Sequence, residues 1–276
     1  MRTIVHLSDL HFGRIDPSVI GPLTEAVWEI KPHVVTVSGD LTQRARSHEF
    51  IAAREFLDSL PQPQIVVPGN HDVPLYNVFA RFVDKLDKYR DYISDDLRPF
   101  FVDEEIAVFG VNTARSWTIK GGRINEEQVA WLRDKLCELK DDVVKAIVSH
   151  HPFDLPEGRH ERDLVGRARM AVENLARCGA DLFLAGHLHV GHTGHTATRY
   201  KSSGYSALVV QAGTASSTRG RGEANSFNVV RLEHPGIVVE RMVWQPEPAV
   251  FVLTSTESFR HTVDGWARVE DVSVSH

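Results

Sequence analysis

The sequence predicts a layered α/β protein, and two patterns lead to this prediction. Short apolar runs typical of strands alternate with stretches of helical periodicity from Thr3 to about residue 185. From about Thr193 onward, successive β-like segments are separated by Gly, Ser and Pro. A chain of 276 residues with 42% hydrophobic residues can form one large core. We therefore expect a single domain over residues 1–276, with 234–276 as a C-terminal β extension.

The first third of the chain repeats a strand followed by a helix. Strands are expected at residues 3–7, 34–37 and 65–67. Asp16 before Pro17 is typical of a helix start, and Ser47 is expected to cap the second helix. Residues 74–92 are expected to be helical with one break, and two apolar runs at 100–102 and 106–111 predict a hairpin.

The later part of the chain predicts two more strand and helix pairs before the β-rich tail. Asn125 and Gln128 have the spacing of a capping box at the start of a helix that ends near Leu139. We expect a strand at 143–148, a helix from Asp163 to Arg177 and a strand at 182–184, and we expect the run Thr214–Gly222 to be a mobile loop. The tail is expected to form antiparallel strands of a second sheet at 193–200, 207–211, 227–232, 237–244 and 250–254.

Composition favours a cytoplasmic protein that does not bind nucleic acid. A formal charge of −6 provides no general basic field, so nucleic acid is disfavoured as a partner. No apolar run is long enough to span a membrane, and the N-terminal residues lack a secretion signal pattern. Cys137 and Cys178 are too few for a disulfide framework, which fits a reducing compartment. A homo-oligomer is left open.

Polar side chains follow five of the predicted strands. Each residue alone is typical of a turn or a structural histidine, but histidines at several strand ends are not needed for helix capping. Carboxylate, imidazole and amide donors together suit Mn, Fe, Co or Zn, and seven donors exceed one tetrahedral site. Two ions sharing a carboxylate can activate a bridging water for attack at phosphorus. The seven donors are Asp9, His11, Asp40, Asn70, His150, His187 and His189.

These motifs resemble the calcineurin-like metallophosphoesterase superfamily. The five blocks of that pattern occur in order between residues 3 and 190, and the sequence around them is most similar to the bacterial class III 3′,5′-cyclic-nucleotide phosphodiesterases. The blocks are Asp9-Leu10-His11, Gly39-Asp40, Gly69-Asn70-His71-Asp72, His150 and Gly186-His187-Leu188-His189. The resemblance implies a four-layer αββα sandwich of two mixed β-sheets flanked by helices.

The resemblance also implies a role for each residue. One metal would be held by Asp9, His11 and His189. The second would be held by Asn70, His150 and His187, with Asp40 bridging the two ions. His71 would protonate the leaving group or stabilise the transition state, and Asp72 would orient His71. We expect two divalent or mixed-valence ions, with Mn or Fe favoured over Zn or Co.

The expected reaction is hydrolysis of a phosphodiester by a metal-bridging hydroxide, with 3′,5′-cyclic AMP as the first candidate substrate. Trp117 and Phe153 are considered as residues that stack on a base, although core packing is the commoner role of aromatic residues. Two alternatives within this fold are a phosphomonoesterase and a broad-specificity phosphodiesterase. A further alternative is a non-catalytic binding scaffold, as in the retromer subunit that resembles these enzymes.

Overall fold

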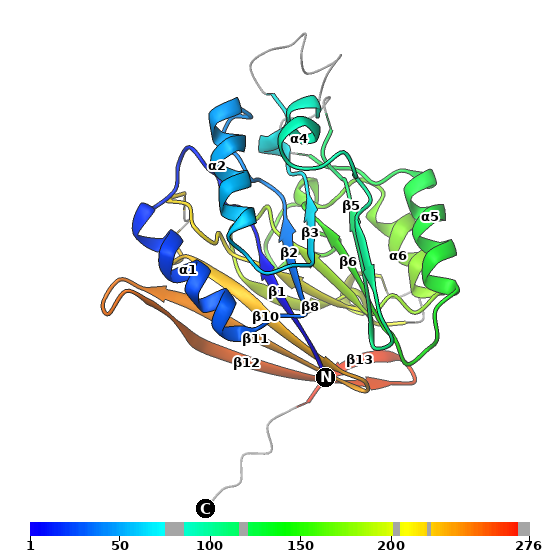
Figure 1. The fold of residues 1–276 in the computed structure, drawn as a ribbon. Helices are drawn as coiled ribbons and strands as arrows, with labels where there is room; N and C mark the ends of the chain where they lie inside the picture. The colour runs from blue at the N-terminus through cyan, green and yellow to red at the C-terminus, as the bar shows by residue number, and fades with distance from the viewer. Residues whose placement is uncertain (75–85, 116–120, 201–204, 220–221, 270–276) are drawn as a thin grey trace, which may run out of the picture.

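The computed structural model describes residues 1–74, 86–115, 121–200, 205–219 and 222–269 as two β-sheets packed face to face between two layers of helices (Figure 1). This arrangement confirms the predicted αββα sandwich. Within the described residues, none of the helices is both long and apolar enough to cross a lipid bilayer.

The first sheet has seven strands in the order β13-β12-β11-β10-β1-β2-β3. β1, β2 and β3 are parallel, and β10 pairs antiparallel with β1. The tail strands from Ser226 onward therefore extend the first sheet, which corrects the expectation that the whole tail belongs to a second one, whereas the expected strands at 193–200 and 207–211 do lie in the second sheet. The strands are β1 (Arg2–Leu7), β2 (Val34–Ser38), β3 (Gln64–Val67), β10 (Ser226–Glu233), β11 (Gly236–Gln245), β12 (Val250–Thr262) and β13 (Gly265–Arg268).

The second sheet has six strands in the order β4-β5-β6-β7-β9-β8. β5, β6, β7 and β9 are parallel, and the predicted hairpin of β4 and β5 is confirmed. The strand expected at 193–200 is shorter, because β8 ends at His195 and the short helix α7 (Thr196–Arg199) follows. The strands are β4 (Phe100–Val102), β5 (Ile106–Val111), β6 (Val144–Ser149), β7 (Leu182–Ala185), β8 (His192–His195) and β9 (Leu208–Gln211).

Two of the helices begin at a predicted side-chain cap. Asp16 caps α1 through a hydrogen bond from the backbone N–H of Ser18, and Asn125 caps α5 with Gln128 as predicted. The cap position of the helix that starts at Ser47 is instead Arg46, without a side-chain cap hydrogen bond, which corrects the expectation that Ser47 caps it. Of the helix expected over 74–92, the described part is α4, and residues 75–85 lie outside the described ranges. The helices are α1 (Pro17–Ile30), α2 (Ser47–Asp58), α4 (Asp87–Tyr92), α5 (Glu126–Cys137) and α6 (Ala168–Ala176), with short 3-10 turns at Asn70–Asp72 and Glu161–Asp163.

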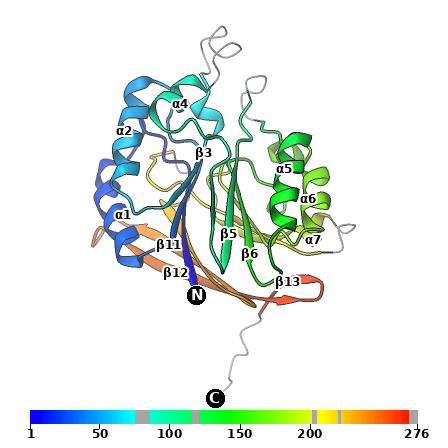
Figure 2. The same cartoon turned by 45° about the vertical axis from the view of Figure 1, so that its right-hand side comes forward.

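Three apolar clusters hold the layers together. α1, α2 and α4 cover the outer face of the first sheet, and α5 and α6 cover the outer face of the second (Figure 2). Between the sheets, alternate residues such as Ile4 of β1 and Val148 of β6 form the third cluster. Because the parallel strands are buried on both faces, they read as continuous apolar runs in the sequence.

The two cysteines form a disulfide. Cys137 at the end of α5 is bonded to Cys178 just after α6, and their Cα atoms lie 4.7 Å apart. The bond joins the two helices on the outer face of the second sheet. The expectation of reduced cysteines is therefore corrected, because residues 41 positions apart in the sequence are neighbours in the fold.

Candidate metal centre

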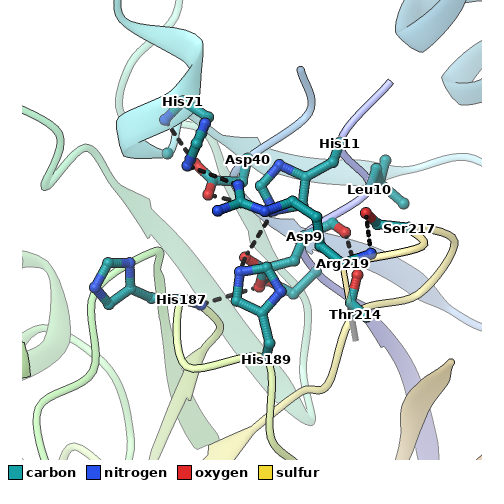
Figure 3. A network of polar contacts seen from close by, with 12 residues as sticks. Asp9, Leu10, His11, Asp40, His71, His187, His189, Thr214, Ser217 and Arg219 are labelled. Atoms are coloured by element: carbon teal, nitrogen blue, oxygen red, sulfur yellow. Dashed lines mark hydrogen bonds and ion pairs between the residues drawn. The ribbon is translucent and has the colours of Figure 1, made fainter. Parts of the chain in front are cut away.

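The seven predicted donor residues converge at the carboxyl ends of the parallel strands. Asp9 and His11 follow β1, Asp40 follows β2, and Asn70 follows β3. His150 follows β6 in the other sheet, as His187 and His189 follow β7. Figure 3 shows several of these side chains pointing toward one another. All are buried except His187, which is half-buried. The structure therefore brings every predicted ligand to one place.

One group of donors surrounds Asp9. Its Oδ1 atom lies 3.6 Å from His11 Nε2 and 3.4 Å from His189 Nε2. Both Asp9 Oδ1 and His11 Nε2 are buried without a hydrogen-bond partner. A metal ion between such atoms would supply the missing interaction, since buried polar groups are normally satisfied. These residues fit a metal ion.

A second group surrounds the side-chain oxygen of Asn70. Asn70 Oδ1 lies 3.1 Å from both His150 Nε2 and His187 Nδ1, and the two ring nitrogens are 3.2 Å apart. In a tetrahedral site with bonds of about 2.1 Å, neighbouring ligand atoms are separated by roughly 3.4 Å. His150 Nδ1 lies 2.8 Å from the carbonyl oxygen of Ser38, so the proton resides there and Nε2 is free to bind a metal.

Asp40 lies between the two groups. Its Oδ2 atom is 3.7 Å from His11 Nε2, and its Oδ1 atom is 3.4 Å from His150 Nε2. One oxygen thus faces each group, as a shared ligand requires. The set of two carboxylates, four imidazoles and one amide fits transition metals or zinc better than Mg²⁺ or Ca²⁺.

The ligand loops have an unusual backbone conformation. Nine non-glycine residues in the described chain have positive φ angles, and five of them are candidate ligands: Asp9, His11, Asp40, His187 and His189. Left-handed backbone is unfavourable for residues with a Cβ atom and persists at functional sites where the surroundings impose it. Neighbouring glycines provide the necessary space, because a Cβ atom on Gly69 would lie 2.2 Å from Asp40 Oδ1.

Burial and neighbouring charges set the protonation of the centre. Burial would raise the pKa of Asp9, but the histidines around it, His189 foremost, hold it well below its usual range. Burial lowers the pKa of His187 to about 3 and that of His189 to about 4. These two histidines are therefore neutral at pH 7, and a metal can bind them without displacing a proton.

His71 lies beside the centre, and its ring is not held by the expected partner. Its Nδ1 atom is 2.8 Å from the carbonyl oxygen of Gln43. The carboxylate of Asp72 instead accepts hydrogen bonds from the backbone N–H groups of Leu41, Thr42 and Gly69. Asp72 therefore fixes two ligand loops against each other, which corrects its predicted role of orienting His71.

A cavity of about 350 Å³ opens above the ligands. It is lined by Asp40, His71, His187 and His189 from the centre and by Arg219 from the segment after β9. Sequence reasoning did not select Arg219, because the Ser, Gly and Arg composition of 214–222 indicates a loop rather than a site. The described part of that segment is ordered by hydrogen bonds, and Thr214–Ser217 is buried.

Of the two aromatic residues considered for base stacking, Phe153 does not line this cavity. Phe153 is fully buried and packs against Phe183, so it belongs to the core. Trp117 lies outside the described residues. His151 is buried beside His150 and His187, and its Nδ1 atom is 2.9 Å from the hydroxyl of Thr113.

Comparison with known proteins relates this centre to phosphoesterases. The family model described as calcineurin-like phosphoesterase matches residues 2–191. A glycerophosphodiester phosphodiesterase, GpdQ, of Enterobacter lignolyticus is 28% identical over 180 residues, which are 58% of this chain and 60% of that protein. The 3′,5′-cyclic adenosine monophosphate phosphodiesterase CpdA of Escherichia coli K12 is 28% identical over 56% of each chain. The matches thus span less than two thirds of these relatives.

A solved structure supports the fold. The purple acid phosphatase PPD1 from yellow lupin superposes with a TM-score of 0.64 at 11% identity, covering 93% of this chain and 53% of that one. At this identity the likeness concerns the arrangement of the sheets and helices.

Proposed function

Since the chain belongs to the calcineurin-like phosphoesterase family, we propose that it hydrolyses a small-molecule phosphodiester with two metal ions bound at the centre described above. The observation that carries this proposal is the convergence of seven donors, including the unpartnered buried atoms Asp9 Oδ1 and His11 Nε2, below an open cavity. We further propose that residues 1–276 act as one domain.

The two groups of donors suggest how the ions are shared. Asp9, His11 and His189 would hold one ion, Asn70, His150 and His187 would hold the other, and Asp40 would contact both. When bound, such a pair of ions lowers the pKa of a water molecule and neutralises charge on the phosphate. We expect Mn or Fe, with Zn or Co as alternatives, because imidazole and carboxylate donors suit all four.

His71 is proposed to act on the substrate rather than on a metal. Its half-buried ring lines the cavity, and its backbone N–H donates to Asp40 Oδ1 at 2.8 Å, which keeps it close to the bridging ligand. From there the ring can help to stabilise charge in the transition state.

A phosphodiester is favoured over a phosphomonoester because the similar proteins GpdQ and CpdA are both named as phosphodiesterases. Cyclic AMP is the first candidate, and a glycerophosphodiester is the second. Both substrates are polar anions, and the cavity is lined mainly by polar and charged side chains.

A substrate panel tests the proposal. The purified protein is assayed with Mn, Fe, Co or Zn against cyclic AMP, bis-p-nitrophenyl phosphate, glycerophosphodiesters and p-nitrophenyl phosphate. We expect hydrolysis of the diesters. Hydrolysis of p-nitrophenyl phosphate alone would indicate a phosphomonoesterase. A protein that binds no metal and hydrolyses none of these esters would be a binding scaffold.

A further inference from the structure

We propose that Arg219 is a catalytic residue whose guanidinium binds the phosphate undergoing hydrolysis, and that His71 positions it. The inference rests on the proposed phosphodiesterase function and adds a residue that none of the five sequence blocks contains. Three observations lead to it: the anchoring of the segment that carries Arg219, the hydrogen bond between Arg219 and His71, and the place of both side chains above the metal ligands.

The segment 214–219 is fastened to the loop that carries Asp9 and His11. Thr214 Oγ1 donates to the carbonyl oxygen of Asp9 at 2.6 Å, and Ser216 Oγ donates to that of Leu10 at 3.0 Å. The backbone N–H of Arg219 donates to Ser217 Oγ, and that hydroxyl donates to the carbonyl oxygen of Arg14, both at 3.1 Å. The backbone of Arg219 is therefore placed relative to the ligand loop by a chain of hydrogen bonds.

The side chain of Arg219 then turns toward His71. Arg219 Nη1 lies 2.9 Å from His71 Nε2. A dashed line in Figure 3 marks this contact. Because a carbonyl oxygen only accepts and a guanidinium only donates, the contacts with Gln43 and Arg219 together place the ring proton of His71 on Nδ1. His71 Nε2 is then an acceptor for the Arg219 N–H, and the two contacts fix both the ring and the guanidinium.

This arrangement places a cation where a substrate anion must lie. Arg219 lines the same cavity as Asp40, His187 and His189. A guanidinium has five N–H donors and can therefore contact more than one group at a time, phosphate oxygens included. It is also always charged and matches the geometry of two phosphate oxygens.

Such a donor can assist the chemistry. During hydrolysis the oxygen of a water molecule forms a bond to phosphorus, the bond from phosphorus to the alcohol oxygen breaks, and that oxygen receives a proton that originates from the water. Negative charge builds up on the non-bridging oxygens in the transition state, and hydrogen bonds directed at them accelerate the reaction. Arg219 donates hydrogen bonds throughout and transfers no proton.

The test compares Arg219→Ala and Arg219→Lys with the wild type and with Arg14→Ala. Arg14 is the matched control because its side chain is exposed and does not line the cavity. With bis-p-nitrophenyl phosphate we expect kcat of Arg219→Ala to fall by about 10²- to 10³-fold, with a smaller change in KM, as for removal of one transition-state donor. Arg219→Lys keeps the charge without the planar fork and should retain part of the activity.

Two further readouts separate a substrate contact from a structural role. Metal content per chain should be the same in all four proteins, and added guanidinium should restore part of the activity of Arg219→Ala only. The affinity of the metal-loaded protein for inorganic phosphate should fall about tenfold or more in Arg219→Ala, since hydrogen bonds to charged groups are strong.

The outcomes distinguish this inference from the proposed function. If Arg219→Ala keeps the kcat and the phosphate affinity of the wild type, Arg219 does not contact the phosphate. The proposed phosphodiesterase function would remain intact in that case. If the wild type hydrolyses no ester but loses phosphate affinity in Arg219→Ala, the proposed reaction is wrong and the anion contact holds. If the metal-loaded wild type itself does not bind inorganic phosphate, the proposed contact between Arg219 and phosphate is wrong.

Discussion

The carboxylate of Asp40 accepts a hydrogen bond from the backbone N–H of His71 at 2.8 Å. The residue proposed to be shared by both ions thus also holds the backbone of the residue proposed to act on the substrate. Substitutions at the two positions should nevertheless differ in one measurable property, which is the amount of metal bound.

The first prediction concerns Asp40. The two carboxylate oxygens of Asp40 face His11 and His150 separately, so Asp40→Ala should weaken both metal sites. Loss of a residue that only supports a ligand typically lowers metal affinity 10- to 100-fold, and the loss of Asp40 should lower it further. Metal per chain after dialysis and kcat should both fall. Asp58→Ala on the exposed side of α2 is the control. Retention of both ions would remove Asp40 from the ligand set.

The second prediction concerns His71. No metal site needs its ring, because Nδ1 bonds to Gln43 and Nε2 to Arg219. His71→Ala should therefore keep its metal and lose turnover by about 10²- to 10³-fold, because Arg219 is then no longer held in place. Metal analysis and steady-state kinetics measure the two effects, with the exposed His48→Ala as control. Metal loss equal to that of Asp40→Ala would place His71 among the ligands.

The third prediction concerns Gly69. A Cβ atom there would lie 2.2 Å from Asp40 Oδ1, so Gly69→Ala must displace Asp40 or its loop. We expect reduced metal binding and a loss of about 1–3 kcal/mol in the free energy of unfolding, as for other overpacked sites. Gly21→Ala is a matched control, because nothing lies within 4 Å of its added Cβ in α1. Chemical denaturation and metal titration would show the difference, and equal behaviour of the two variants would contradict the prediction.

The fourth prediction concerns pH and His6. Burial lowers the pKa of His6 to about 3, against 6.5 in the unfolded chain. Below pH 6.5 the unfolded state therefore binds a proton that the folded state does not, and stability falls as the pH decreases toward 3. His6 should contribute a loss of roughly 2–3 kcal/mol in unfolding free energy between pH 7.5 and 4.5. His6→Gln should show a shallower pH dependence in urea denaturation, and parallel curves would refute this assignment.

The fifth prediction concerns the bond between Cys137 and Cys178. Closing a loop between residues 41 positions apart reduces the entropy of the unfolded chain, which raises the free energy of unfolding by about 4 kcal/mol. The double variant Cys137→Ser and Cys178→Ser, or reduction by dithiothreitol, should lower the melting temperature. Dithiothreitol should not affect the double variant. Thiol titration of the untreated wild type should detect no free cysteine, and two free thiols would show that the bond does not form.

The donor residues of the site were predictable because each lies directly after an apolar run. The carboxyl ends of parallel strands meet at one edge of a sheet, so local sequence and this general rule were enough to bring Asp9 and Asp40 together. His150 follows a strand of the other sheet, and its place beside them was expected only from the family resemblance. The motif around Gly69 was likewise visible as a short polar turn after a strand. Fold class followed from the same alternation of strands and helices.

Long-range pairing was not predictable in the same way. The periodicity of residues 226–233 does not specify that they pair with β1 rather than start a new sheet. Alternation of apolar and polar residues determines which face of a strand is buried, but it does not determine which strand lies next to it. Arg219 was missed for a related reason. Its position depends on hydrogen bonds to the carbonyl groups of residues 9–14, which are more than 200 positions away.

Each proposed ion takes ligands from both sheets, because His189 joins Asp9 and His11 at one ion, and His150 and His187 join Asn70 at the other. Metal binding at these sites would therefore link the two β-sheets across the interface between them. Ions that bind only the folded chain stabilise it by mass action. The concentration of free metal would then control how firmly the sheets are joined as well as the rate of the proposed reaction.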